Sequence, residues 1–173
     1  MDNPSWKPAF RAVFDRGMAA WQAGRRTPAS LLGPEDVAFL RSIGASAQEL
    51  FDFVDDLQRY GEPDYATAEA IAGIRREYFL EVLQGRPASR VGRMEDLPAK
   101  TAAVDGITWL PRLIEKARWK LRGEMPDDLM YGCGGDRAFI KTTRLTLPGF
   151  LRLVWEGGPE DRRIIDTVRQ SMT

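Results

Sequence analysis

The sequence predicts an all-α fold, a compact single-domain helical bundle of about seven to eight helices with a glycine-rich loop. Three observations support this prediction. Apolar residues recur at three- and four-residue spacing along most of the 173 residues. Glycine, proline and capping residues fall at the ends of these periodic segments. No segment shows a convincing β-hairpin or a regular alternation of strands with helices.

Residues 1–85 are expected to form an amino-terminal helical segment. Apolar residues at helical spacing predict a first helix over 5–23, and Gly24 follows it as a left-handed cap. A short second helix over 34–43 is expected to begin at Pro34, because proline is tolerated at the first helical position.

Two further helices in this half are expected to begin with capping residues. Ser46 and Glu49 match a capping box, which predicts a helix over 47–60. Asp64 is placed to cap a fourth helix that runs up to Gly85. Side-chain oxygens at such positions accept hydrogen bonds from backbone N–H groups that the first helical turn leaves unpaired.

Residues 86–106 lose helical periodicity and contain two prolines and two glycines. This composition predicts a connection with a short turn after Pro98. The connection is the best candidate for an internal boundary in a chain that we otherwise expect to be one domain, 1–173.

Residues 107–173 are expected to form a second helical segment. A strong apolar pattern predicts a helix over 108–122 that ends at Gly123. Asp136 is placed to cap a short helix that continues through Ile140. Two last helices are expected. Thr146 and Pro148 mark the start of the first of them, and Gly157, Gly158 and Pro159 separate it from the second.

Charge and composition exclude several classes of protein. Lys plus Arg and Asp plus Glu are equal at 25 each, with no basic stripe, so no nucleic-acid partner is expected. The first residues lack the pattern of a signal peptide, and no apolar run approaches the ~18 residues of a membrane helix. We therefore expect a cytoplasmic protein with no membrane partner. Cys133 is the only cysteine, which excludes an intramolecular disulfide.

The chain contains no histidine, which limits the chemistry that it can perform. Ser-His-Asp and Cys-His hydrolysis and histidine-based zinc sites are excluded. A phosphate-binding P-loop and a dinucleotide-binding glycine motif are also missing from the sequence. No metal and no cofactor are therefore expected.

The glycine-rich loop over 130–137 is the first candidate site. Its glycines let the backbone approach a ligand, and Cys133 lies just before a predicted helix start, where the helix dipole favours a thiolate. Cys133 and Asp136 are the candidate catalytic residues, as nucleophile and as acid or base. The alternative is a plain turn in which Cys133 only packs and Asp136 only caps the next helix.

The polar face of the 108–122 helix is the second candidate site. Two cations one turn apart beside an indole can hold a carboxylate or a phosphate on an aromatic floor. The alternative is an ordinary solvated helix face. Together with residues of the loop, the predicted ligand-binding residues are Arg112, Lys116, Trp119, Tyr131 and Arg137.

A row of carboxylates at Asp52, Asp55 and Asp56, with Glu62 and Asp64 beyond it, is the third candidate. Acidic residues at this spacing can bind hard cations through oxygen. The spacing of a calcium-binding loop is missing, however, so an exposed acidic helix face is the favoured interpretation, and no metal site is predicted.

The carboxy-terminal stretch carries a family resemblance. The run DGITWLPRLIEKAR from Asp105 is followed by LRGEMP from Leu121, then by Tyr131 and by GDRAF from Gly135. This order resembles the bacterial family known as domain of unknown function 5069, over about residues 105–170. The resemblance implies a shared fold and a shared site region, whose matching positions are Arg112, Lys116, Arg118, Tyr131, Asp136 and Arg137.

These patterns lead to three hypotheses of function. The leading one is a module that binds a small anionic ligand in a cleft between the 108–122 helix and the 130–137 loop. The alternatives are a metal-independent enzyme that uses Cys133 or Asp136, and a structural domain for protein–protein interaction. In each case we expect the loop to lie against the helix, with Asp136 either capping the next helix or pairing with an arginine of the 108–122 helix.

Overall fold

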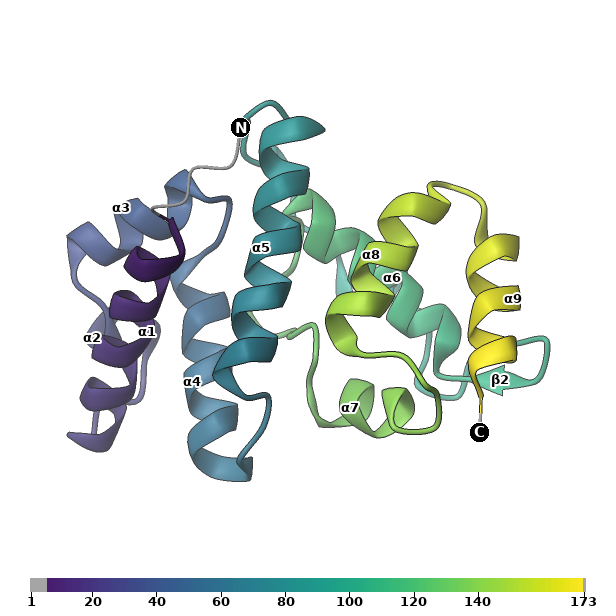
Figure 1. The fold of residues 1–173 in the computed structure, drawn as a ribbon, viewed down its shortest axis with the longest axis horizontal. Coiled ribbons are helices and arrows are strands. Elements are labelled where there is room, and N and C mark those ends of the chain that lie inside the picture. The colour runs from purple at the N-terminus through teal and green to yellow at the C-terminus, as the bar shows by residue number, and fades with distance from the viewer. Residues whose placement is uncertain (1–5, 173) are drawn as a thin grey trace. The chain divides into compact units, whose positions relative to one another are not determined.

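A computed structural model describes residues 6–172 of the chain. Ser5, where the first predicted helix begins, lies outside the described residues. Within this part of the chain the structure has nine α-helices, one short 3-10 helix and a single two-stranded hairpin, which confirms the all-α fold class (Figure 1). Every helix over 6–172 is too short or too polar to cross a membrane.

The chain divides into two compact units. The first ends at Pro87 and the second begins at Ala88, so the division falls inside the 86–106 connection. The single-domain organisation stays a prediction.

The first unit contains five helices, and α1 packs against α2, α4 and α5. The predicted caps are confirmed: Ser46 and Glu49 exchange their capping-box hydrogen bonds, and Asp64 accepts from the backbone of Thr67. One helix was missed because four residues are too few to show a period. The helices are α1 (Trp6–Gln22), α2 (Pro28–Leu31), α3 (Pro34–Ser42), α4 (Ala47–Tyr60) and α5 (Tyr65–Glu81).

The core of the first unit is built on an aromatic cluster. Phe10 and Phe14 of α1 are almost fully buried, and the ring of Tyr65 meets Phe14 edge to face with centroids 5.0 Å apart. Trp6 extends the cluster towards α5, where a side chain at Gly73 would approach its ring to 3.3 Å. Aromatic pairs in this geometry stabilise a core beyond the area that they bury.

The carboxylates of the third candidate make hydrogen bonds within the chain. Asp55 accepts from the indole of Trp21 at 2.8 Å and from the guanidinium of Arg59, and Asp52 accepts from the amide of Gln48. Among the described residues, no group of three metal-ligating side chains is close enough to hold a metal ion.

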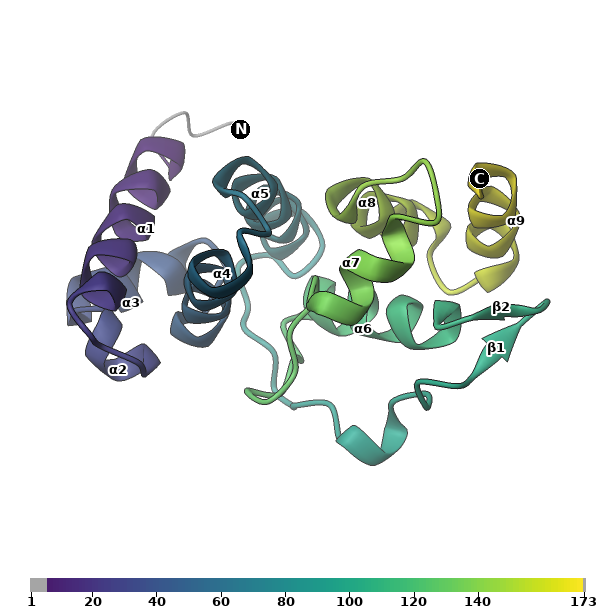
Figure 2. The same ribbon diagram turned by 90° about the horizontal axis from the view of Figure 1, so that it is seen from below.

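The second unit is built around α8, which packs against α6, α7 and α9. Figure 1 shows α8 beside α6 and α9, and Figure 2 shows the hairpin leading directly into α6. The elements of this unit are η1 (Met94–Asp96), β1 (Ala103–Val104), β2 (Ile107–Thr108), α6 (Leu110–Arg122), α7 (Gly134–Ile140), α8 (Leu147–Gly157) and α9 (Asp161–Ser171).

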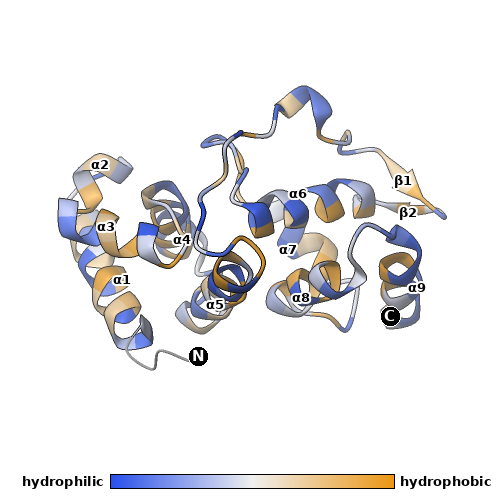
Figure 3. Cartoon of the chain, turned by 90° about the horizontal axis from the view of Figure 1, so that it is seen from above, coloured by the Kyte–Doolittle hydropathy of each residue, from blue (hydrophilic) through white to orange (hydrophobic). Residues whose placement is uncertain are grey.

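The hairpin corrects the prediction that the chain has no hairpin. Asp105 and Gly106 have φ angles of 51° and 79°, the left-handed pair that a two-residue type I′ turn requires. Each strand has two residues, too few for the alternation of apolar and polar residues to be visible in the sequence. In Figure 3 the strands are coloured as hydrophobic and the turn between them as hydrophilic.

The segment before the hairpin follows the prediction in part. The turn after Pro98 is confirmed by a hydrogen bond from the backbone N–H of Ala102 to the carbonyl of Ala99. The 3-10 helix just before Pro98 was missed, because its three residues, Met94–Asp96, carry no helical period.

The hairpin turn is joined to α9 by ion pairs. The carboxylate of Asp105 accepts from Arg169 and from Arg162. The hydrogen bond from Arg169, helped by Arg162, lowers the pKa of Asp105 from its ordinary value of 3.8 against the opposing effect of desolvation. The turn and the last helix are therefore coupled through one carboxylate.

A buried arginine lies on α5. Arg75 is 3% exposed, and among the described residues its Nε and Nη1 atoms have no hydrogen-bond partner. Its guanidinium carbon lies 5.3 Å from the ring centroid of Phe79. Burial lowers the pKa of Arg75, and the nearby charge of Glu49 opposes that effect. A buried donor without a partner costs free energy that no contact recovers.

We expect Arg75→Met to leave the fold intact and to raise the free energy of unfolding by about 1–3 kcal/mol, because the substitution removes the unsatisfied donors and keeps the length of the side chain. Urea denaturation of both proteins measures this difference. A substantially less stable variant would show that the guanidinium is satisfied in solution, for example by bound water.

We expect Asp105→Asn to make the protein less stable at neutral pH and equally stable in acid. A lowered folded-state pKa gives stabilisation that is present above the unfolded pKa of about 4 and is lost as the pH falls through the folded-state value. Asparagine tolerates the left-handed turn, so the hairpin is retained. Thermal unfolding of the wild type and of Asp105→Asn, measured from acid to neutral pH, tests this prediction. A difference in stability between the two proteins that does not depend on pH would contradict the role of the charge.

Candidate functional site

The helix α6 is buried on its apolar face and also over part of the face that the sequence predicts to be polar. Lys116 is 0% exposed and Trp119 is 3% exposed, while Arg112 is half-buried. The residues that the sequence places on a polar arc therefore lie largely inside the protein. Lys116 needs a partner there, because an unpaired ammonium in the interior is strongly destabilised.

Lys116 has two partners, both from the segment that leads into α7. Its Nζ atom donates to the Oδ2 atom of Asp136 and to the Sγ atom of Cys133, the latter at 3.2 Å. The side chain of Asp136 is as buried as that of Lys116. These contacts confirm that the 130–137 loop lies against the 108–122 helix.

Asp136 also accepts hydrogen bonds from two groups other than Lys116. Its Oδ1 atom accepts from the indole N–H of Trp109 at 3.0 Å, and its Oδ2 atom accepts from the backbone N–H of Gly132 at 2.8 Å. The carboxylate is thus satisfied on both oxygens, as a buried charge requires.

The expected pairing of Asp136 with an arginine is wrong, because the cationic partner from α6 is Lys116. The prediction that Asp136 is the N-terminal capping residue that precedes the short helix also needs correction. The helix α7 begins at Gly134, so Asp136 lies in its first turn and reaches back to the backbone of Gly132.

Trp109 holds its indole on Asp136 at the cost of backbone strain. It precedes the first residue of α6 with a φ of 75°, a conformation that bulky residues rarely adopt. A side chain at Gly135 would meet the indole ring at 2.4 Å, so glycine is required there. Such outliers persist only where the surrounding contacts fix them, and they gather at functional sites.

Cys133 is less buried than the ion pair that it contacts. It is half-buried, whereas Lys116 and Asp136 are buried. It directly precedes the first residue of α7, as predicted, and it is a free thiol. The cluster therefore combines a buried ion pair with a half-buried cysteine.

The other predicted ligand-binding residues make contacts of their own with the backbone. The hydroxyl of Tyr131 donates to the carbonyl of Leu147 at 2.7 Å, and Arg137 donates to the carbonyl of Gly132 at 2.8 Å. Burial raises the pKa of Tyr131, and the charge of Asp136 adds to that effect. Both side chains hold the loop in place.

Arg112 and Trp119 stabilise the preceding connection. Arg112 donates to the carbonyl of Pro98 at 2.7 Å. The indole of Trp119 covers Gly92 so closely that a side chain there would lie 2.6 Å from the ring. Among the five predicted ligand-binding residues, Lys116 is the one whose side chain is seen to hydrogen-bond both Cys133 and Asp136 in the described part of the chain.

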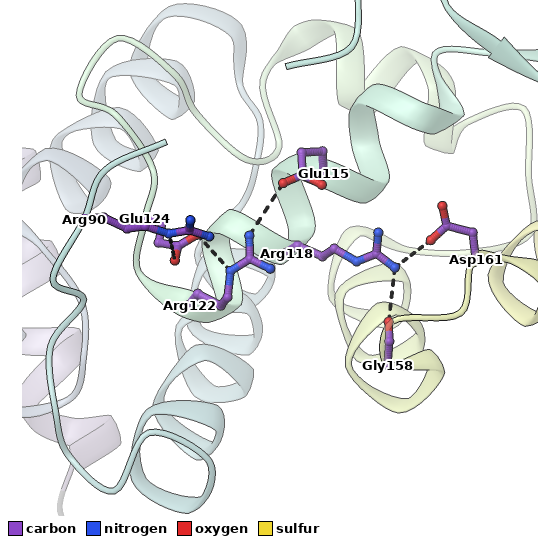
Figure 4. A network of polar contacts seen from close by, with 7 residues as sticks. All are labelled: Arg90, Glu115, Arg118, Arg122, Glu124, Gly158 and Asp161. Atoms are coloured by element: carbon purple, nitrogen blue, oxygen red, sulfur yellow. Dashed lines mark hydrogen bonds and ion pairs between the residues drawn. The ribbon is translucent and has the colours of Figure 1, made fainter. Parts of the chain in front are cut away.

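A second polar network runs along α6 (Figure 4). Arg118 donates to the carbonyl of Gly158 and pairs with Asp161 at the start of α9. Figure 4 also shows Arg90 and Arg122 converging on one carboxylate, that of Glu124. Burial raises the pKa of Glu124, but the hydrogen bonds from these two arginines outweigh it, so the pKa is lowered overall.

Sequence reasoning missed Trp109 and the Gly132 N–H as members of the cluster. It also separated Lys116, assigned to ligand binding, from Cys133 and Asp136, assigned to catalysis. The predicted helix over 108–122 included Trp109, whereas α6 begins at Leu110, so the left-handed position of Trp109 before the helix was not anticipated.

These contacts define a class of protein: a small helical unit built on a buried lysine–aspartate ion pair that also contacts a cysteine at the start of a short helix. Residues 95–173 match the family described as "Domain of unknown function (DUF5069)". The match confirms the resemblance seen in the sequence and begins earlier than expected. No curated protein and no solved structure matches the chain.

We expect Lys116→Met to lower the free energy of unfolding by about 3–5 kcal/mol, because it leaves the buried carboxylate of Asp136 without its cation. The double variant Lys116→Met/Asp136→Asn should be more stable than this single variant, because the uncompensated charge is gone. Urea denaturation of the wild type, the two single variants Lys116→Met and Asp136→Asn, and the double variant measures the coupling. A double variant that loses the sum of the two single losses would contradict the ion pair.

Proposed function

We propose that the second unit is a metal-independent enzyme in which Cys133 is the nucleophile. Lys116 stabilises negative charge on the sulfur, and Asp136 orients Lys116. The observation that supports this proposal is the contact of one buried ammonium with both the Sγ atom of Cys133, at 3.2 Å, and the carboxylate of Asp136.

This arrangement matches the general logic of an activated nucleophile. Such sites hold a nucleophile within hydrogen-bond reach of a second group, which a third group orients. Here the second group is a lysine, in a chain that has no histidine. Asp136 is fixed in turn by Trp109 and by the backbone of Gly132, so the charged groups are preorganised.

The chemistry that fits the cluster is acyl transfer from a small ester. The thiol loses its proton to solvent, and the thiolate of Cys133 attacks the carbonyl carbon to form a thioester. Lys116 gives a proton to the departing alcohol. Water then hydrolyses the thioester, returns a proton to Lys116 and releases a carboxylic acid, so that ester and water become acid and alcohol.

The small anionic ligand expected from the sequence stays a prediction. Its support is weaker than that of the nucleophile, because Arg112, Tyr131 and Arg137 direct their donors to backbone carbonyls. A donor committed to a buried carbonyl is costly to withdraw for a ligand.

We expect the wild type to react with p-nitrophenyl acetate in a burst that leaves one acetyl group on Cys133. Cys133→Ser should abolish the burst, and Lys116→Met/Asp136→Asn should slow acetylation by about 10²-fold or more, because the cation that stabilises negative charge on the sulfur is lost. Stopped-flow release of p-nitrophenolate and peptide mass spectrometry measure the rate and the modified residue.

The matched control is Lys141→Met, which removes an exposed lysine of the same unit and should leave the rate unchanged. Circular dichroism establishes that each variant is folded. The proposal is wrong if Cys133→Ser keeps the burst, or if the folded double variant is acetylated as fast as the wild type.

A further inference from the structure

We infer that peroxide joins Cys133 to Lys116 in a reversible sulfur–nitrogen cross-link, a sulfenamide. This inference concerns regulation of the site and rests on the proposed function only in one respect, that the cross-link consumes the proposed nucleophile. The formation of the bond itself depends on the geometry of the cluster and not on turnover.

The first step is oxidation of the sulfur. Cys133 is half-buried, whereas Lys116 and Asp136 are buried, so a small peroxide is expected to reach Cys133 first. The thiol and hydrogen peroxide give a sulfenic acid and water. Because the chain has no second cysteine, this sulfenic acid has no thiol of its own with which to form a disulfide.

The second step is attack by the nearest amine. The Nζ atom of Lys116 lies 3.2 Å from the sulfur, already in hydrogen-bond contact with it. A sulfenic acid is known to condense with nitrogen as well as with thiols. The amine displaces the hydroxyl group, the S–N bond forms, and water leaves with one proton from the amine.

Asp136 makes this step feasible inside the protein. The ammonium of Lys116 must lose a proton before its nitrogen has a lone pair, and the Oδ2 atom of Asp136 is in direct contact with it. Transfer of that proton leaves a neutral carboxyl group beside a neutral amine, so no unpaired charge is left buried.

The cross-link has structural and chemical consequences. It ties α6 to the residue before α7 and removes both the thiolate and the cation from the proposed site. It also stops further oxidation of the sulfur to the irreversible sulfinic acid. An external thiol attacks the sulfur, releases the amine of Lys116 and then frees Cys133 by exchange, so the change is reversible.

The test treats the full chain with hydrogen peroxide and measures mass. The cross-linked chain should be about 2 Da lighter than the reduced chain, because two hydrogens are lost overall, whereas oxidation products that retain oxygen are heavier. After trypsin digestion the peptide Leu113–Arg118 should be joined to Gly123–Arg137, with no cleavage at Lys116. Dithiothreitol should separate the two peptides.

Two lysine variants give a matched comparison. Lys116→Arg keeps a cation for Asp136 but replaces the amine with a guanidinium that stays protonated, so the cross-link should be lost. Lys120→Arg makes the same change one turn further along α6 and should leave the cross-link intact. Cys133→Ser should abolish it. If Lys116→Arg does not fold, the joined peptides of the wild type decide the matter.

The inference is overturned if peroxide converts Cys133 to a sulfinic acid, or to a sulfenic acid trapped by dimedone, without the joined peptides. It is also overturned if the Lys116→Arg variant is folded and still becomes about 2 Da lighter after peroxide treatment, because that mass loss marks the condensation. A cross-link without acetylation by p-nitrophenyl acetate would refute the proposed function alone. Acetylation without a cross-link would refute this inference alone.

Discussion

The second unit depends on one buried ion pair, that of Lys116 with Asp136. Two charges in the protein interior are tolerated only when both are fully hydrogen-bonded. That requirement accounts for the neighbours of the pair. Trp109 accepts a left-handed backbone to place its indole on the carboxylate, and Gly135 has no side chain because the indole occupies that space.

In the function that we propose, the same pair also supplies the chemistry of the site. An ammonium that must be held against a carboxylate is also held against the sulfur of Cys133. Under that proposal stability and reactivity share the same atoms, so a substitution of Lys116 is expected to change both. Variants that keep charge balance, such as a double substitution of the pair or an arginine in place of the lysine, are needed to separate the two effects.

Several residues that the sequence marks as ligand-binding instead satisfy the backbone of the long connections. Irregular segments bring carbonyl groups into the interior, and each of these needs a donor. Arg112 serves the carbonyl of Pro98, Arg137 that of Gly132, and Tyr131 that of Leu147. A cationic or hydroxyl side chain close to a loop can therefore be explained by its hydrogen bond to the loop backbone as well as by ligand binding.

The sequence alone determined the longer helices and the excluded chemistries. Helical period, the capping box at Ser46 and the cap at Asp64 are local signals, readable without knowledge of packing, and the lack of histidine is a property of composition. Tertiary structure decided the site. Helical period places Lys116 on a polar arc but does not say whether packing covers that arc, because burial depends on segments distant in the chain. Its partners lie 17 and 20 residues further on, beyond the reach of any local pattern.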